Sequence, residues 1–208
     1  MSTPLRIAVA DDEPEMREYL QEALPRLGHQ VVAVAETGRQ LVDRCAAARP
    51  DLVITDIKMP GKDGIEVAEE ANRERQVPVI LVSAHHDADL IVRAGADHIM
   101  AYLIKPIKQA DLETAIFLAM LRFEHFQKLR QEAASLRQAL EDRKVIERAK
   151  GIIMKRARLD ESEAFRRLQR LASDRNHRLV DVAQSILAAE EAFQPLAPGE
   201  GQPHNKRS

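Results

Sequence analysis

One stretch in the N-terminal half of the chain is especially informative about the fold. It reads Asp51-Leu52-Val53-Ile54-Thr55-Asp56-Ile57-Lys58-Met59-Pro60-Gly61-Lys62-Asp63-Gly64. Its short apolar run, residues 52–54, is typical of a buried strand in a parallel sheet. Asp56 follows where that strand should end, and ligands of open α/β sheets bind at the carboxyl ends of the strands. Taken alone, Asp56 could equally be a capping residue of the next turn, so the choice depends on the rest of the chain.

Strands and helices are predicted to alternate on both sides of this stretch. Further apolar runs predict strands at 5–10, 30–35, 77–82 and 101–104. Helical spacing predicts helices at 15–27, 38–48, 67–75 and 87–96, and another from about residue 109. This alternation indicates right-handed βαβ crossovers. The predicted fold class is therefore α/β, with a five-stranded doubly wound parallel sheet.

Polar side chains follow four of the five predicted strands. Asp11 and Asp12 follow the first strand, Ser83 follows the fourth, and Lys105 follows the fifth. Together with Asp56, three carboxylates would then share one crevice and repel one another unless a cation lies among them, and such oxygen ligands suit Mg²⁺. Lys105 adds a fixed positive charge, so the site could hold a phosphoryl group on Asp56. The alternative roles are helix capping for the first two aspartates and a solvated side chain for the lysine.

The motifs at these strand ends resemble the receiver domain of two-component response regulators. They are Asp11-Asp12-Glu13, Asp56 with Met59-Pro60 and Gly64, Ser83-Ala84, and Tyr102 with Lys105-Pro106. The resemblance covers residues 4–121 and implies a flavodoxin-like fold. It also implies that Asp56 is the phosphoacceptor and that a sensor histidine kinase is the phosphodonor.

The same resemblance implies a role for each residue of the site. Mg²⁺ is expected to be held by Asp11, Asp12, Asp56 and the backbone carbonyl of Lys58. The phosphoryl oxygens are expected to be bound by Ser83 and Lys105, with Tyr102 as the switch aromatic. Two departures from the family pattern, Ile107 in place of a frequent Phe and the turn Asp97-His98, put the dimer geometry in question.

An enzymatic reading of the site is less favoured. An aspartyl-phosphate hydrolase would need a second acidic residue two positions after Asp56, where Lys58 stands, and no substrate cap is inserted. We therefore expect no enzyme activity beyond phosphoryl transfer to and loss from Asp56. His85 and His86 are expected to be solvated loop residues rather than a metal site.

Composition limits the remaining possibilities. The chain has 208 residues, 45% of them hydrophobic, and the single Cys45 cannot form an internal disulfide. No apolar run is long enough to span a membrane, and a cytoplasmic location is expected. The net charge of −2 hides an asymmetry, because residues 1–121 carry −7 and residues 122–178 carry +7. An acidic half joined to a basic half indicates two separate tasks.

Residues 111–157 contain no Pro and only one Gly, which predicts one long helix or two abutting ones. Apolar residues recur along it at steps of four and three: Leu112, Ile116, Ala119, Phe123 and Phe126, then Leu129, Ala133, Leu136 and Leu140. The step between the two sets is one residue short of a continuous heptad. The stripe predicts a coiled-coil linker at 122–135 and a homodimer that phosphorylation strengthens. The alternative is that the stripe packs back onto the chain's own domains.

The basic half is predicted to form a small all-α domain of three helical segments, with a capping box at Asp160-Glu161-Ser162-Glu163. Residues 136–191 resemble the ANTAR domain, the RNA-binding module of antitermination regulators. The residues that carry the resemblance are Arg148-Ala149-Lys150-Gly151-Ile152-Ile153-Met154, Glu163-Ala164-Phe165 with Leu168, Asn176, Arg178, Leu179 and Asp181-Val182-Ala183. The resemblance implies a stem-loop RNA in a nascent transcript as the partner. Residues 192–208 are expected to form a disordered tail.

The residues expected to contact RNA are Arg148, Lys150, Lys155 and Arg178. A basic helix face can also be a solvated surface with local ion pairs, and a DNA-binding response regulator or a protein-interaction module is the alternative function. A glycine at position 151, inside a predicted helix, needs an explanation, because glycine destabilises a helix relative to alanine. Close approach of an RNA backbone and tight packing against Phe165 are equally possible reasons.

Overall fold

The computed structural model of the chain describes residues 3–84 and 98–192. The chain divides into two compact units between Leu129 and Arg130, and each unit is described by itself. Among the described residues, no helix is long and apolar enough to cross a membrane.

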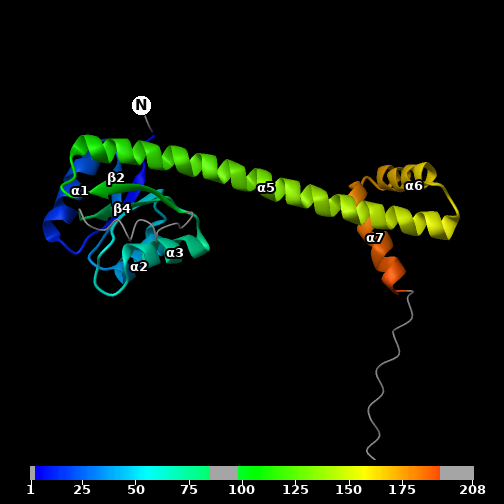
Figure 1. Cartoon of the computed structure of the whole chain (residues 1–208), viewed down its shortest axis with the longest axis horizontal. Coiled ribbons are helices and arrows are strands. Elements are labelled where there is room, and N and C mark those ends of the chain that lie inside the picture. Colours follow the sequence, from blue (N-terminus) through cyan, green and yellow to red (C-terminus); the bar gives the residue numbers. More distant parts are fainter. Residues whose placement is uncertain (1–2, 85–97, 193–208) are drawn as a thin grey trace, which may run out of the picture. The chain divides into compact units, whose positions relative to one another are not determined.

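The first unit contains a five-stranded parallel sheet, which confirms the predicted fold class (Figure 1). Its strands are β1 (Arg6–Ala10), β2 (Gln30–Ala35), β3 (Leu52–Asp56), β4 (Val79–Ser83) and β5 (Ile99–Ile104). Their order across the sheet is β2-β1-β3-β4-β5. The order reverses between β1 and β3, so the ends of these two strands flank the crevice where ligands of doubly wound sheets bind.

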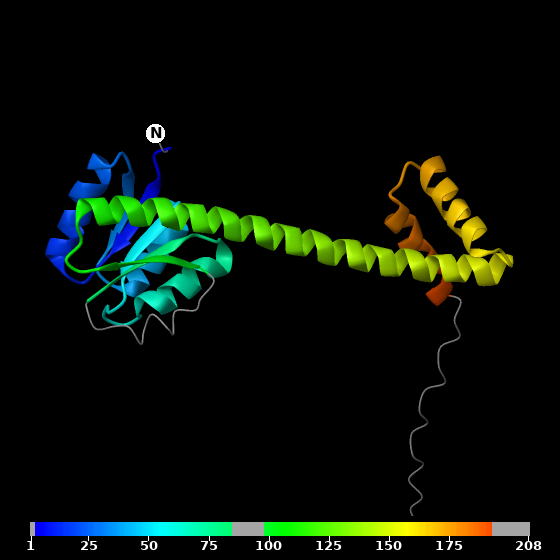
Figure 2. The same cartoon turned by 45° about the horizontal axis from the view of Figure 1, so that its top comes forward.

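Helices cover both faces of this sheet (Figure 2). On one face lie α1 (Pro14–Arg26) and the beginning of α5 (Gln109–Ala157), and on the other lie α2 (Gly38–Ala48) and α3 (Gly64–Glu74). Successive strand residues alternate between the two cores, as the period of a strand requires. Every residue of β3 is buried, which explains why its sequence reads as a continuous apolar run before Asp56. The helix predicted at 87–96 lies outside the described residues.

Helix α3 begins at Gly64, three residues before the predicted start at Val67. The reason is a capping box: the Asp63 side chain accepts hydrogen bonds from the backbone N–H groups of Ile65 and Glu66, and the Glu66 carboxylate accepts one from Asp63 N–H. The earlier start brings the helix close behind Asp56. Gly64 N–H donates to the carbonyl of Ile57 at 2.9 Å.

The predicted long helix is one continuous element, α5, and its apolar stripe has two environments. Leu112, Ile116 and Ala119 are buried in the core of the first unit. By contrast, Leu129, Leu136 and Leu140 are 60–67% exposed. The packing alternative therefore holds for the first part of the stripe, and the change of environment falls where the heptad phase slips.

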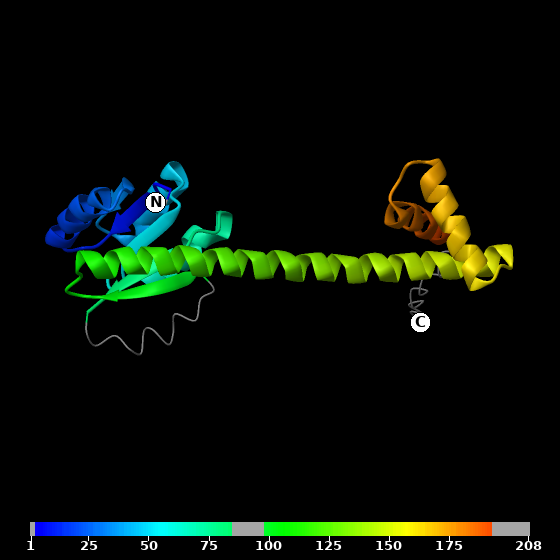
Figure 3. The same cartoon turned by 90° about the horizontal axis from the view of Figure 1, so that it is seen from above.

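The second unit consists of the end of α5 with α6 (Glu161–Asp174) and α7 (Leu179–Ala192), seen from above in Figure 3. Arg158 adopts a left-handed conformation after α5, and Asp160 forms the predicted capping box with Glu163. The small core is lined by Ala149, Ile153, Ala164, Leu168, Ala172, Val182 and Ala183. The expected disordered tail lies outside the described residues from position 193 onward.

Replacing Gly64 with alanine is expected to destabilise the first unit by about 1–3 kcal/mol, as overpacking typically does. A Cβ atom at this position would lie 2.3 Å from the carbonyl oxygen of Asp56, so helix α3 or the end of β3 would have to move. Urea denaturation measures the loss. Glu69→Ala, on the exposed side of the same helix, should change stability by less than about 0.5 kcal/mol. Equal stability of the two variants would contradict this packing argument.

Candidate functional site

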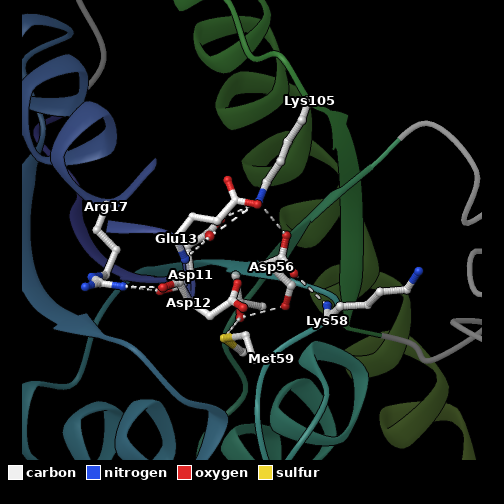
Figure 4. A network of polar contacts seen from close by, with 9 residues as sticks. Asp11, Asp12, Glu13, Arg17, Asp56, Lys58, Met59 and Lys105 are labelled. Atoms are coloured by element: carbon white, nitrogen blue, oxygen red, sulfur yellow. Dashed lines mark hydrogen bonds and ion pairs between the residues drawn. The ribbon is translucent and has the colours of Figure 1, made fainter. Parts of the chain in front are cut away.

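A lysine and three carboxylates meet at the carboxyl ends of β1, β3 and β5 (Figure 4). The Lys105 ammonium lies 3.0 Å from Oδ1 of Asp56, 3.0 Å from Oδ2 of Asp11 and 3.4 Å from Oε1 of Glu13. Asp11 is fully buried, and Asp56 is 6% exposed. The structure therefore brings together the predicted residues Asp11, Asp56 and Lys105 in one buried cluster.

Backbone groups hold the two buried carboxylates in place. Lys58 N–H donates to Oδ2 of Asp56 at 2.6 Å, and Glu13 N–H donates to Oδ1 of Asp11 at 2.9 Å. Oδ1 of Asp56 faces Lys105, and both oxygens of Asp11 lie near it, since Lys105 also donates a hydrogen bond to Oδ1 of Asp11 at 3.3 Å. A carboxylate fixed at one oxygen presents its other oxygen in a defined direction, which suits a nucleophile or a ligand.

Burial sets the protonation equilibria of this cluster. Loss of hydration raises the pKa of Asp56 and the pKa of Asp11, and hydrogen bonding and attraction by Lys105 oppose the rise without cancelling it. Burial lowers the pKa of Lys105, but its hydrogen bonds to Asp11 and Asp56 and their charges raise that pKa overall. The Lys105 ammonium is thus held charged, and burial makes ionisation of the two carboxylates less favourable than in water.

The acidic loop after β1 offers the donor set of a hard cation. Carboxylate oxygens of Asp11, Asp12 and Glu13 lie within 4.8 Å of one another. The buried Oδ2 of Asp11 has no hydrogen-bond partner among the described residues, although it forms an ion pair with Lys105. Hard oxygen ligands in this arrangement fit Mg²⁺. The contributions of Asp56 and of the Lys58 carbonyl stay predictions.

The other predicted residues of the site lie on β4 and β5. Ser83 is buried at the end of β4, and its carbonyl accepts a hydrogen bond from Lys105 N–H at 2.9 Å. Tyr102 is half-buried on β5, where burial raises the pKa of its phenol. Ile107 is buried in the core beneath α1 and α5, so it serves as a packing residue. The predicted loop residues His85 and His86 lie outside the described residues, as does Asp97.

Two residues of the site were not predicted from the sequence. Arg17, on α1, donates from Nη1 to the backbone carbonyls of Asp11 and Asp12, both at 2.9 Å, and so fixes the acidic loop. Glu13 stands in the motif, but its reach to Lys105 was not foreseen. The sequence places Arg17 in the first turns of the predicted helix, but nothing in the sequence distinguishes it from the other arginines on helices.

In the second unit, the predicted RNA contact Lys150 is engaged in ion pairs with two glutamates. Its side chain is only 9% exposed, and its ammonium lies 2.6 Å from Glu147 and 2.7 Å from Glu161. The aliphatic part of the Lys150 side chain is covered, and its ammonium links α5 to the start of α6 through these ion pairs. The positive charge is therefore already paired with carboxylates within the unit. The role of Lys150 in RNA binding stays a prediction, and loss of its side chain should destabilise the fold.

The other three expected RNA contacts are exposed. Arg178 forms an ion pair with Asp181 at 2.7 Å, and Arg148 lies 3.7 Å from Glu191. Lys155 is exposed and has no ion pair among the described residues. These three cations can reach a ligand without unpacking the core, and their role in RNA binding stays a prediction.

Comparison with known proteins identifies both units. A model of the response regulator receiver domain matches residues 7–117, and a model of the ANTAR domain matches residues 134–187. The chain belongs to the response regulator family. The receiver domain of this response regulator contains the acidic cluster, and the ANTAR domain contains the basic helices.

The relatives extend this assignment over most of the chain. Transcriptional regulatory protein PdtaR of Mycobacterium tuberculosis is 39% identical over 186 residues, which are 89% of this chain and 91% of that protein. The DNA-binding transcriptional regulator NtrC of Escherichia coli is 32% identical over 124 residues, covering 59% of this chain and 26% of NtrC. A receiver domain structure from Clostridium thermocellum matches with a TM-score of 0.53 and 29% identity, covering 57% of this chain and 96% of that one.

Replacing Asp56 with asparagine is expected to raise the free energy of unfolding of the metal-free protein at pH 7. Because folding raises the pKa of Asp56, ionising this carboxylate disfavours the folded state by about 1.4 kcal/mol for each pKa unit. The folded state loses stability as pH rises from the pKa of Asp56 in the unfolded chain through its higher pKa in the folded chain. Urea denaturation in the presence of a chelator should therefore show a gain for Asp56→Asn at pH 7 that disappears below about pH 3.8.

Asp12→Asn is the matched control, because Asp12 belongs to the same acidic site but is exposed. Its stability should stay within about 0.5 kcal/mol of the wild type. A metal-free Asp56→Asn protein that is less stable than the wild type at pH 7 would show that Lys105 more than compensates for burial.

Proposed function

We propose that this response regulator is a phosphorylation-controlled RNA-binding protein that acts as a transcription antiterminator. The observation that carries the proposal is the buried Asp56–Lys105 pair, at 3.0 Å, in a chain whose second domain belongs to the ANTAR family. Receiver domains take a phosphoryl group from sensor kinases, and ANTAR domains bind RNA. PdtaR supports this reading over 91% of its length, whereas the DNA-binding NtrC matches over 26% of its own.

Asp56 is the proposed phosphoacceptor. One of its carboxylate oxygens attacks the phosphorus of a phosphohistidine, an O–P bond forms as the N–P bond breaks, and the imidazole of the donor leaves. Asp11, Asp12, Asp56 and the Lys58 carbonyl would hold Mg²⁺, which would neutralise charge at the transferring group. Lys105 lies within reach of the new phosphoryl oxygens, and Ser83 ends the strand beside it. No other catalytic activity is proposed.

Transfer to Asp56 is expected to depend on both the carboxylate and the cation. A small phosphodonor such as acetyl phosphate should label the wild-type chain in the presence of Mg²⁺, and EDTA should reduce labelling at least tenfold, since the carboxylates then repel the incoming anion. Intact-mass measurement gives the result. Asp56→Asn should remain unlabelled, and Asp51→Asn, at the start of the same segment, should be labelled as the wild type. An acid-labile phosphoryl group on Asp56→Asn would refute the assignment.

The exposed leucines of α5 support a proposed homodimer. Leu129, Leu136 and Leu140 stay exposed among the described residues, at the spacing of a coiled-coil seam. Three large apolar side chains in one stripe are a usual sign of a partner surface. We therefore propose a parallel contact between two copies of this helix segment, strengthened when Asp56 is phosphorylated.

The basic ANTAR helices support the proposed RNA partner. Arg167 and Arg170 lie exposed on α6, and neither has an ion pair among the described residues. Phe165 on the same helix is 37% exposed, so an aromatic face is accessible beside the arginines. Splayed bases of an RNA loop stack on such aromatic rings, and phosphates pair with the cations.

Lysines 150 and 155 are expected to behave differently in RNA binding. The full chain should enrich hairpin RNAs from a pool with randomised loops and should bind them more tightly than duplex DNA of equal length. Lys155→Ala should weaken binding of the enriched hairpin and lower the salt slope by about 0.7 to 0.9, with the melting temperature unchanged. Lys150→Ala should lower the melting temperature, because it breaks the contact between α5 and α6.

Fluorescence anisotropy and thermal denaturation provide the two measurements. Lys150→Met serves as a control, because it keeps the aliphatic stem without the charge and should recover part of the lost stability. Enrichment of duplex DNA over every hairpin would overturn the RNA proposal in favour of a DNA-binding regulator.

A further inference from the structure

Gly151 lies in the interior of α5 and is exposed, and the described structure gives no packing reason for it. A Cβ atom built at this position would meet no atom within 4 Å among the described residues. Packing against Phe165, one of the two reasons predicted from the sequence, is therefore not supported. Since glycine disfavours a helix relative to alanine, the remaining reason is a ligand that approaches the helix backbone.

Gly151 lines a cleft of about 350 Å³ between α5 and α7. The α5 side contributes Arg148, Lys155 and Arg156, and the α7 side ends in Glu190 and Glu191. Ile152 and Leu187 complete the lining. Three cations at one cleft match a polyanion, and the missing side chain at Gly151 lets a backbone come close to the helix.

The two glutamates hold two of these cations in the way that phosphates would. Arg156 makes a two-pronged contact with Glu190, with Nε and Nη2 each 3.1 Å from a carboxylate oxygen. Arg148 lies 3.7 Å from Glu191. The planar fork of an arginine binds carboxylate and phosphate in the same geometry, so either group can occupy it. Both arginines and Glu191 are 64–68% exposed, and Glu190 is 23% exposed. Water therefore reaches the cation of each pair, and ion pairs in such positions contribute little stability, so a phosphate can replace the carboxylate.

We propose that the Gly151 cleft binds a segment of RNA sugar-phosphate backbone, and that Glu190 and Glu191 are internal competitors which the phosphates displace. The inference rests on the proposed RNA-binding function and specifies its site and regulation. A ligand that places two phosphates at once releases both glutamates, whereas a single anion has to compete with a tethered carboxylate. The competition therefore favours a continuous nucleic-acid backbone over small anions.

The test uses the full chain and the hairpin enriched from the randomised pool. Glu190→Gln should bind this hairpin about three- to tenfold more tightly than the wild type at low salt, since it frees Arg156, and the gain should shrink as salt rises. Glu132→Gln, which removes the same charge from an exposed site elsewhere on α5, should change affinity less than about twofold. Thermal denaturation checks that both variants fold.

Gly151→Ala supplies the second measurement. It should raise the melting temperature and weaken hairpin binding, because its methyl group stands in the path of the backbone but touches nothing in the protein. If wild type binds the hairpin and Glu190→Gln binds it no more tightly than Glu132→Gln, the competitor role is refuted while the RNA function stands. If Gly151→Ala leaves binding intact and instead changes the dimer constant in sedimentation, the cleft packs a second chain and the inference fails. A wild type that binds no hairpin at all refutes the proposed function itself.

Discussion

The contact between one lysine and two buried carboxylates is the constraint on which the receiver domain depends. Asp11 and Asp56 lie at the ends of neighbouring strands, so the sheet order alone brings their charges together. Lys105 follows β5, which is separated from β3 by β4, or about 9.5 Å at ordinary strand spacing. A long flexible cation is therefore needed to cover that span, and the burial that raises the carboxylate pKa values also strengthens the attraction to it.

The surrounding backbone prevents the carboxylates from relieving their repulsion by moving apart. Arg17 holds the carbonyls of the acidic loop, and Gly64 lets α3 lie directly behind the carbonyl of Asp56. The domain thus keeps two buried carboxylates beside Lys105, and burial makes their ionised forms less favourable than they are in water. Sites that hold charges in advance lose little free energy to reorganisation during a reaction, which suits the proposed phosphoryl transfer.

Features set by the order of strands along the chain could be predicted from the sequence. Features that depend on a distant segment folding back onto a residue could not. The strand-end positions of Asp56 and Lys105 follow from apolar runs and the rule for parallel sheets. The burial of Lys150 depends on α6 turning back so that Glu161 comes beside it, and charge alone cannot distinguish this lysine from Lys155. The early start of α3 was different, because its Asp63–Glu66 capping box could have been recognised in the sequence.

The phase slip in the stripe of α5 also limits how phosphorylation can strengthen a dimer. Leu112, Ile116 and Ala119 already belong to the receiver core, so they could join an interface only by unpacking it. Phe117 and Leu121, on the exposed side of the same helix segment, are 63% and 40% exposed. The proposed dimer contact, where it uses this described segment of α5, would therefore involve its outer face, while the leucines beyond residue 129 can pair without disturbing the receiver core. The slip separates a segment that packs within one chain from a segment suited to a partner.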